Sequence, residues 1–185
     1  AEVARAALRG GAGVIQLRDK TRDKGQLLPL ALELGKLCAE AGALFIVNDD
    51  IDLALAAGAD GVHLGQKDLP LGVARRVLPL GAVVGRSTAT LEEALRAQEE
   101  GADYIAVGAI YPTTSKASTR PAGLATLRQV KKAVSAPVVA IGGINEGNLA
   151  EVVKAGADAA AVISAVMGAE DVEGAARKLA SLMKG

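Results

Sequence analysis

The sequence is poor in aromatic residues and carries no excess charge of either sign. Its 185 residues include one phenylalanine, two tyrosines and no tryptophan, and 21 basic residues balance 21 acidic ones. Single-stranded nucleic acids are usually bound on aromatic platforms, and anionic polymers or membranes attract a net positive charge. The composition therefore argues against a nucleic-acid partner and against an anionic membrane surface.

Cysteine and long hydrophobic segments are also scarce. Cys38 is the sole cysteine, which excludes an internal disulfide and a cysteine metal cluster. It lies on a helix-spaced apolar stripe with Leu34 and Leu37, a pattern that favours a buried structural thiol over a nucleophile. No segment is apolar for long enough to span a bilayer, and the first residues lack a signal-peptide core. A cytoplasmic location is therefore expected.

What the sequence has is a regular alternation of helical and extended patterns. Gly-Ala-Asp recurs at 58–60, 101–103 and 156–158, each time between an apolar-striped helix and a short apolar run. Glycine just past a helix end lets the chain reverse into a strand. Helices are predicted at Glu2–Arg9, Lys24–Ala41, Ile51–Ala57, Leu71–Val77, Leu91–Glu100, Leu124–Val134, Glu146–Ala155 and Val172–Met183. Strands are predicted at Gly13–Leu17, Leu44–Val47, Gly61–Leu64, Ala82–Gly85, Tyr104–Gly108, Val138–Ile141 and Ala159–Ile163.

This alternation indicates an α/β protein with a parallel sheet. Several strands are continuous apolar runs, as expected when helices cover both faces. Eight helices with seven strands fall one strand short of a (β/α)₈ TIM barrel, and the missing first strand is expected to precede Ala1. We expect a single TIM-barrel domain over residues 1–185. An open doubly wound sheet is the alternative.

Polar residues gather where the predicted strands end, which is the active-site rim of a parallel barrel. Asp49 and Asp68 follow two neighbouring strands, so their carboxylates are expected to face one another and to suit a divalent ion with a phosphorylated substrate. The alternative is that Asp49 or Asp50 merely caps the next helix. The other rim residues from these strand ends are Gln16, Arg18, Asp19, Lys20, Asn48, Gln66, Lys67, Arg86, Ser87 and Thr88.

The later strand ends suggest a phosphate site. Gly142 and Gly143 allow backbone N–H groups to approach an anion near the start of the helix predicted from Glu146, and Ser164 lies at the next strand end. A long polar loop, Tyr111 to Ala122, brings Thr113, Ser115 and Lys116 to the same rim. Arg18, Lys20 and Lys116 suit a second and more highly charged group.

Three charged or titratable residues are expected to lie outside the chemistry of the site. His63 is the only histidine and lies inside a strand, which favours packing or a hydrogen bond beneath the site over catalysis as a base. Lys67, and Arg120 at the far end of the long loop, are expected to be solvated surface charges.

With these residues assembled, the chain resembles the thiamine phosphate synthase family of (β/α)₈ barrels. The resemblance extends from Ala6 through Ser164. It rests on six motifs in order: Gln16-Leu17-Arg18-Asp19-Lys20, Asn48-Asp49, Gly61 to Asp68, Gly85-Arg86-Ser87-Thr88, Pro112 to Lys116, and Ile141-Gly142-Gly143-Ile144. The family usually has threonine where Ser115 stands, and the hydroxyl is retained.

The resemblance implies a reaction between a pyrimidine pyrophosphate and a thiazole phosphate that releases pyrophosphate. It assigns Mg²⁺ to Asp49 and Asp68, and catalytic roles to Arg18, Ser87 and Lys116. It implies that the substrate-binding residues are Gln16, Arg18, Lys20, Asn48, Ser87, Thr113, Ser115, Lys116, Gly143, Ile163 and Ser164. The alternatives are a thiazole tautomerase-like barrel and a non-catalytic thiazole phosphate-binding protein. The oligomeric state does not follow from the sequence.

Overall fold

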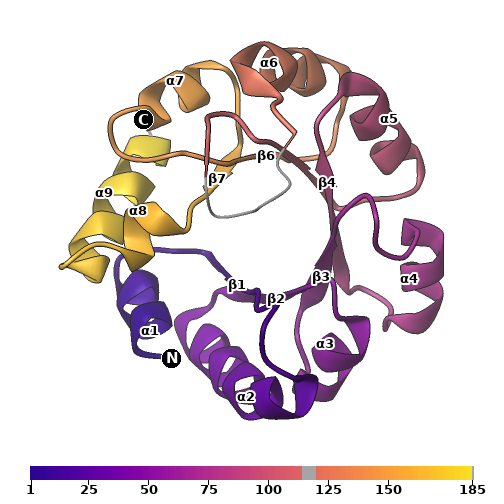
Figure 1. The fold of residues 1–185 in the computed structure, drawn as a ribbon, viewed down its shortest axis with the longest axis vertical. Helices are drawn as coiled ribbons and strands as arrows, with labels where there is room; N and C mark the ends of the chain where they lie inside the picture. Colours follow the sequence, from indigo (N-terminus) through magenta and orange to yellow (C-terminus); the bar gives the residue numbers. More distant parts are fainter. Residues whose placement is uncertain (114–119, 185) are drawn as a thin grey trace.

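The computed structural model describes residues 1–113 and 120–184. Parallel strands line the inside of a ring and helices cover its outside (Figure 1). The strands are β1 (Val14–Leu17), β2 (Leu44–Asn48), β3 (Gly61–Leu64), β4 (Val83–Thr88), β5 (Tyr104–Val107), β6 (Val138–Ile141) and β7 (Ala159–Ala161). The helices are α1 (Glu2–Arg9), α2 (Lys24–Ala41), α3 (Ile51–Ala57), α4 (Leu71–Val77), α5 (Leu91–Glu99), α6 (Gly123–Ala133), α7 (Leu149–Lys154), α8 (Ser164–Met167) and α9 (Val172–Lys184).

All the described strands belong to one sheet whose spatial order is their order in the chain, β1 to β7. Every neighbouring pair is parallel. This confirms the α/β class and the parallel sheet. The sheet curls as in a TIM-like barrel but has seven strands among the described residues, with β1 and β7 as its two edges (Figure 1). Parallel strands bring their carboxyl ends to one rim of the ring.

The repeated Gly-Ala-Asp turns brace the opposite rim. Each glycine has a positive φ (62° at Gly58, 86° at Gly101 and 97° at Gly156), which lets the chain leave the preceding helix. Each aspartate then accepts a backbone hydrogen bond at 2.7 Å from the strand beside its own: Asp60 from Phe45, Asp103 from Val84 and Asp158 from Val138. These carboxylates fix neighbouring strands to each other and serve the fold.

The core lies between the sheet and the helices. Val62, Leu64, Val84 and Ile105 are all 0% exposed, which explains why these strands are continuous apolar runs. Cys38 is 1% exposed in α2, and burial raises the pKa of its thiol, so the prediction of a structural cysteine is confirmed. None of the helices in the described part of the chain is long and apolar enough to cross a membrane.

The predicted end of β4 is wrong, and the error matters for the site. β4 continues to Thr88, so Arg86, Ser87 and Thr88 lie inside the strand rather than after it. Alternate side chains of a strand point to opposite faces. Arg86 is accordingly 8% exposed, with Nη1 donating to the carbonyl oxygen of Leu69 at 3.2 Å.

Two helices near the end of the chain also differ from the predictions. α7 begins at Leu149 rather than near Glu146, because residues 145–148 form a turn in which Asn145 N–H donates to Asn148 Oδ1 at 2.9 Å. β7 ends at Ala161, and Ser164 opens the short helix α8, which was not predicted. The apolar run from Ala159 to Ile163 contains no glycine or proline to indicate that break.

Candidate active site

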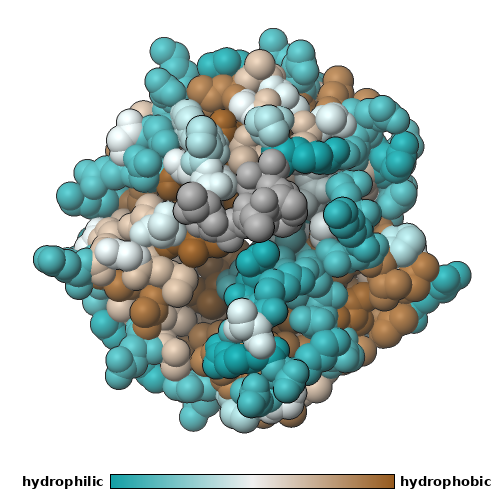
Figure 2. All heavy atoms as spheres, in the orientation of Figure 1, coloured by the Kyte–Doolittle hydropathy of each residue, from teal (hydrophilic) through white to brown (hydrophobic). Residues whose placement is uncertain are grey.

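The predicted rim residues of the first four strands lie where parallel pairing brings strand ends together. Gln16 lies in β1, Asn48 ends β2, Ser87 lies in β4, and Asp49 and Asp68 follow β2 and β3. Figure 2 shows hydrophilic residues gathered over the centre and lower part of this face, with paler and more apolar residues over α8. The rim therefore has a polar side and an apolar side.

Asp49 and Asp68 interact directly, as the sequence predicted. Burial and the neighbouring Asp49 raise the pKa of Asp68. Burial alone would raise the pKa of Asp49, but the hydrogen bond from Asp68 and the ammonium of Lys20 outweigh it and lower that pKa. Two carboxyl groups in contact repel each other when both are ionised, and a bound cation would relieve that repulsion.

The backbone holds Asp49 in an unusual conformation. Its φ is 63°, and it is the only residue other than glycine with a positive φ among those described. Its N–H donates to the carbonyl oxygen of His63 at 2.8 Å, which ties the end of β2 to β3. Left-handed residues of this kind are strained and occur often at functional sites.

A tight turn positions Asp68. The N–H of Gly65 donates to Asp68 Oδ2 at 2.7 Å, and the N–H of Asp68 donates back to the carbonyl oxygen of Gly65 at 3.2 Å. A Cβ on Gly65 would lie 3.0 Å from that same Oδ2, so a larger residue would crowd the carboxylate. The residue is therefore oriented before any ligand arrives.

The loop after β1 is also ordered by its own hydrogen bonds. Asp19 Oδ1 accepts the N–H groups of Thr21 at 2.8 Å and Arg22 at 3.0 Å, and these bonds hold the pKa of Asp19 well below its ordinary value. Arg18 and Lys20 flank this residue and are exposed on the rim. The loop thus presents two cations from a fixed turn.

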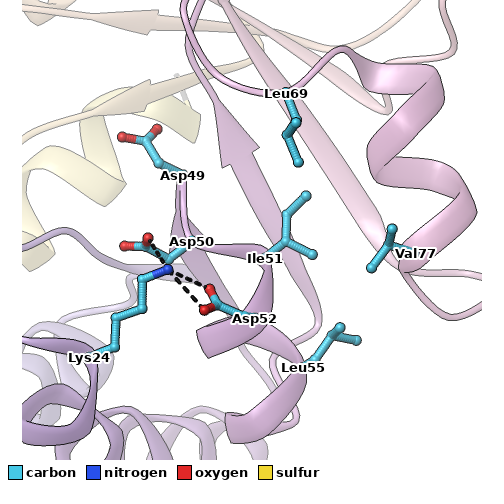
Figure 3. Close-up of a pocket in the computed structure, with 8 residues that line it drawn as sticks. All are labelled: Lys24, Asp49, Asp50, Ile51, Asp52, Leu55, Leu69 and Val77. Carbon is cyan, nitrogen blue, oxygen red and sulfur yellow. Dashed lines mark hydrogen bonds and ion pairs between the residues drawn. The ribbon is translucent and has the colours of Figure 1, made fainter.

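Two lysines in this region form ion pairs with different acidic residues. Lys20 Nζ forms an ion pair with Asp49, whereas Lys24 Nζ contacts Asp50 at 3.0 Å and Asp52 at 2.7 Å. Figure 3 shows Lys24, Asp50 and Asp52 converging, with the carboxylate of Asp49 pointing away from them. All four residues line a groove of about 310 Å³. The rest of the groove is lined by Ile51, Leu55, Leu69 and Val77. Asp50, and not Asp49, occupies the N-cap position of α3, and its side chain forms no capping hydrogen bond there.

His63 lies beneath the rim, as predicted. It is 4% exposed, its Nε2 lies 2.7 Å from Ser87 Oγ, and its Nδ1 lies 2.8 Å from the hydroxyl oxygen of Tyr104. The sequence analysis did not single out Tyr104. The feature that indicates a role for Tyr104 is its pairing with Gly85 across β4 and β5. The register of that pairing is known only from the fold.

The predicted phosphate site lies across the ring. Gly142 and Gly143 have φ values of 100° and 66°, and the carbonyl oxygen of Gly142 accepts the N–H of Tyr111 at 3.0 Å. A Cβ on Gly143 would lie 2.6 Å from the carbonyl oxygen of Pro112, so only glycine allows the two loops to come this close. Ile163 and Ser164 are exposed at the end of β7, on the same rim.

The long loop between β5 and α6 is described only at its ends. Thr113 is half-buried, while Ser115 and Lys116 lie outside the described residues. Beyond them, Arg120 Nη2 contacts the two carboxylate oxygens of Glu93 at 2.5 and 2.6 Å. Arg120 is exposed, as predicted for a surface charge, but its ion pair was not predicted, because Glu93 on α5 lies 27 residues away and only the fold brings the two together.

The carboxyl groups of Asp49 and Asp68 suit one type of metal ion better than others. In residues 1–113 and 120–184, no group of three or more His, Cys, Asp or Glu side chains could hold a metal ion. Mg²⁺ commonly binds through one or two carboxylates together with water and substrate phosphates. Asp49 and Asp68 therefore fit an Mg²⁺ ion that shares its coordination with a phosphorylated ligand.

The sequence is similar to known thiamine-phosphate synthases. A family model described as thiamine monophosphate synthase matches residues 1–166. The thiamine-phosphate synthase of Methanocella arvoryzae is 56% identical over 183 residues, which cover 98% of this chain and 86% of that protein. The thiamine-phosphate synthase of Shouchella clausii is 50% identical over 184 residues, covering 99% of this chain and 88% of that protein.

Solved structures show the same architecture. The thiamine phosphate pyrophosphorylase from Pyrococcus furiosus matches with a TM-score of 0.93 at 46% identity, covering 99% of this chain and 88% of that one. A 3-hexulose-6-phosphate synthase matches with a TM-score of 0.73 at 21% identity, over 97% of this chain and 94% of that one, and shows a shared fold alone.

Proposed function

The chain belongs to the thiamine monophosphate synthase family, and we propose that it joins an aminopyrimidine methyl pyrophosphate to a thiazole phosphate, giving thiamine phosphate and pyrophosphate. It is therefore a transferase acting on small molecules. The observation that carries the proposal is the contact between Asp49 and Asp68 beside Lys20, on a rim that also holds Ser87. A phosphate-only binding protein would have no use for this acid pair.

The chemistry needs charge neutralisation more than proton transfer. The bond between the methylene carbon and the pyrophosphate oxygen breaks, and its electron pair leaves with the pyrophosphate. The electron-rich aminopyrimidine carries the resulting methylene cation, and the lone pair of the thiazole nitrogen forms the new carbon–nitrogen bond. Holding both substrates in place supplies much of the remaining acceleration. The burial of His63 under the rim agrees with a reaction that needs no general base.

The polar side of the rim would hold the pyrophosphate. We assign Arg18, Lys20, Lys116 and Gln16 to its oxygens, because fixed positive charge and hydrogen-bond donors stabilise a leaving group whose charge grows as the bond opens. Asp49 and Asp68 would hold Mg²⁺, which when bound supplies further positive charge to the departing group. The contact between the two carboxyls supports this assignment, since their repulsion favours a cation.

The remaining predicted residues divide between the two organic substrates. Asn48 and Ser87 are assigned to the pyrimidine, because they lie on β2 and β4, the two strands that flank β3, and the acid pair follows β2 and β3. The residues assigned to the thiazole phosphate are Thr113, Ser115, Gly143, Ile163 and Ser164. The positive φ of Gly143 and the exposure of Ile163 on the more apolar side of the rim support a site for a phosphate attached to an apolar ring.

We also propose that an eighth strand completes the barrel between β7 and β1, making one domain with residues 1–185. The two edges carry backbone groups that a strand there would pair, and Val14 on β1 is 50% exposed. The cytoplasm is the compartment that we propose for the reaction.

The test is an assay of the purified full-length protein with both substrates. Thiamine phosphate and pyrophosphate should appear together, and should disappear when Mg²⁺ is removed with a chelator and return when it is restored. A tautomerase or a binding protein would release no pyrophosphate under these conditions. Binding of the thiazole phosphate without any pyrophosphate release would overturn the proposal.

A further inference from the structure

Three side chains from three neighbouring strands form a hydrogen-bonded chain beneath the rim. His63 on β3 lies between Tyr104 on β5 and Ser87 on β4, with Nδ1 2.8 Å from the Tyr104 hydroxyl oxygen and Nε2 2.7 Å from Ser87 Oγ. The histidine and tyrosine rings stack with centroids 5.5 Å apart. His63 is 4% exposed, so this geometry is fixed by the core of the ring.

A glycine makes this chain possible. Tyr104 must pass over β4 to reach His63 on β3, and Gly85 is the residue of β4 that pairs with both of them. A Cβ on Gly85 would lie 2.0 Å from Tyr104 Cζ and 2.4 Å from its hydroxyl oxygen. The missing side chain therefore provides the space that the phenol occupies. The hydrogen-bonded chain of Ser87, His63 and Tyr104 therefore depends on a glycine at position 85.

The direction of the hydrogen bonds follows from Tyr104. Burial raises the pKa of its hydroxyl, so the phenol keeps its proton. A buried hydroxyl proton needs an acceptor, and His63 Nδ1 is the hydrogen-bond partner recorded for this hydroxyl among the described residues. The Tyr104 O–H therefore donates to Nδ1. A neutral imidazole carries a single N–H, which must then be on Nε2 and donate to Ser87 Oγ.

This direction decides what Ser87 can offer a ligand. Its oxygen accepts from His63, so its own proton is available to an acceptor outside the chain of three. In the opposite tautomer Ser87 would donate to Nε2 and present only lone pairs to the rim. The pyrimidine pyrophosphate presents acceptor atoms at its ring nitrogens as well as at its phosphate oxygens, and serine lone pairs facing an acceptor would be unfavourable.

We propose that Tyr104 is a positioning residue that holds His63 in the Nε2–H tautomer and thereby makes the Ser87 hydroxyl a donor to the pyrimidine pyrophosphate. The identity of the ligand rests on the proposed function. The tautomer does not, since it follows from the protein alone. Tyr104 itself touches no substrate in this arrangement and acts through two other side chains.

The tautomer can be measured directly because His63 is the only histidine in the sequence. A two-bond ¹H–¹⁵N correlation spectrum of the full-length protein labelled on histidine, recorded at pH 8, should show a protonated Nε2 and a bare Nδ1. Tyr104→Phe should move the signals toward the Nδ1–H form. Tyr111→Phe removes a phenol hydroxyl that donates to Glu151 at 2.9 Å on another part of the rim, and should leave the spectrum unchanged. A wild-type spectrum with Nδ1 protonated would overturn the inference.

A kinetic cycle tests whether the effect passes through Ser87. Tyr104→Phe should lower kcat about tenfold while leaving KM for the thiazole phosphate unchanged, the size expected from a misdirected hydrogen bond. In a Ser87→Ala background the same change should have no further effect on kcat. An equal loss in both backgrounds would mean that Tyr104 acts structurally, and would overturn the inference. A wild-type protein that forms no thiamine phosphate would overturn the proposed function instead, and the spectrum would still decide the tautomer.

Discussion

The ring of Tyr104 lies across Gly85, so closely that a Cβ on the glycine would come within 2.0 Å of the tyrosine Cζ. The two residues face each other in adjacent parallel strands, β4 and β5. Ser87 lies two residues beyond Gly85 on the same face of β4. A change in packing at Gly85 can therefore affect the position of the Ser87 side chain.

Gly85→Ala should therefore destabilise the protein by about 1–3 kcal/mol, the usual range for forcing an extra methyl group into a packed core. Urea unfolding measures this change. The matched control is Gly72→Ala in α4, where a Cβ would meet nothing within 4 Å. That change should stabilise the protein by about 0.5–1 kcal/mol, because alanine favours a helix over glycine. Equal effects of the two changes would contradict the packing argument.

Asp68→Asn should lower Mg²⁺-dependent turnover at least tenfold, as expected if one of two carboxylate ligands is lost. Titrating Mg²⁺ against the rate of pyrophosphate release measures the effect. Asp52→Asn is the control, because Asp52 contacts Lys24 beside the neighbouring groove. An unchanged Mg²⁺ dependence in Asp68→Asn would remove this residue from the metal site.

The same variant should be more stable than the wild type when no metal is present. The fold raises the pKa of Asp68 above its ordinary value of 3.8, so the ionised form opposes folding. This penalty is absent below pH 3.8 and fully present once the pH exceeds the raised pKa. Thermal unfolding in a chelator should show a higher Tm for Asp68→Asn at pH 7.5 and no difference near pH 3.5.

Ser164→Ala and Lys116→Ala should affect different kinetic constants. The thiazole phosphate is unchanged during the reaction, so losing a contact to it should raise its KM about tenfold with little effect on kcat. The charge on pyrophosphate grows as the bond opens, so Lys116→Ala should lower kcat itself by tenfold or more. Measuring both constants at saturating second substrate separates the two. A similar loss of kcat in both variants would contradict the division of the site.

Arg120→Gln should weaken the fold at neutral pH but not in acid. Burial alone would raise the pKa of Glu93, but the hydrogen bonds from Arg120 and from the N–H of Ala89 outweigh it and hold that pKa below its ordinary value of 4.5. The resulting stability is present above pH 4.5 and is lost as the pH falls through the lowered pKa.

The expected difference is about 1 kcal/mol at pH 7, in the range of a partly exposed ion pair, and it should shrink at pH 3.5. Denaturant unfolding at the two pH values measures it. Arg128→Gln is the control, because Arg128 forms no ion pair with any described residue. A difference that is the same at both pH values would rule out an electrostatic cause.

The sequence predicted those features that depend on local pattern. The seven strands, the order of the helices and the approach of Asp49 to Asp68 all follow from apolar runs, glycine turns and the rule that parallel strands end on one rim. The buried role of His63 followed from its position in the middle of a strand.

The features that were missed depend on register or on long-range contacts. Gly85 was interpreted as the end of its strand, whereas it lies inside β4 to make room for Tyr104. A single sequence does not show which residue of β5 pairs with it. The ion pair of Arg120 was missed because its partner Glu93 lies on a separate helix. The roles of the substrate-contacting residues, with Ser115 and Lys116 among them, remain predictions.

The strands have the same order in the sheet as in the chain. This order has a consequence for the synthesis of the protein on the ribosome. Strands β1 to β4 and the segments that follow them supply the side assigned to pyrophosphate except for Lys116, and the segments after β5, β6 and β7 supply Lys116 and the side assigned to the thiazole phosphate. On a ribosome that adds about 5–20 residues per second, Ser164 emerges roughly 7–30 s after Gln16. The carboxyl pair can therefore form in a nascent chain well before the second half of the site exists. The two substrates cannot react with each other on this site until the segment around Ser164 has been translated.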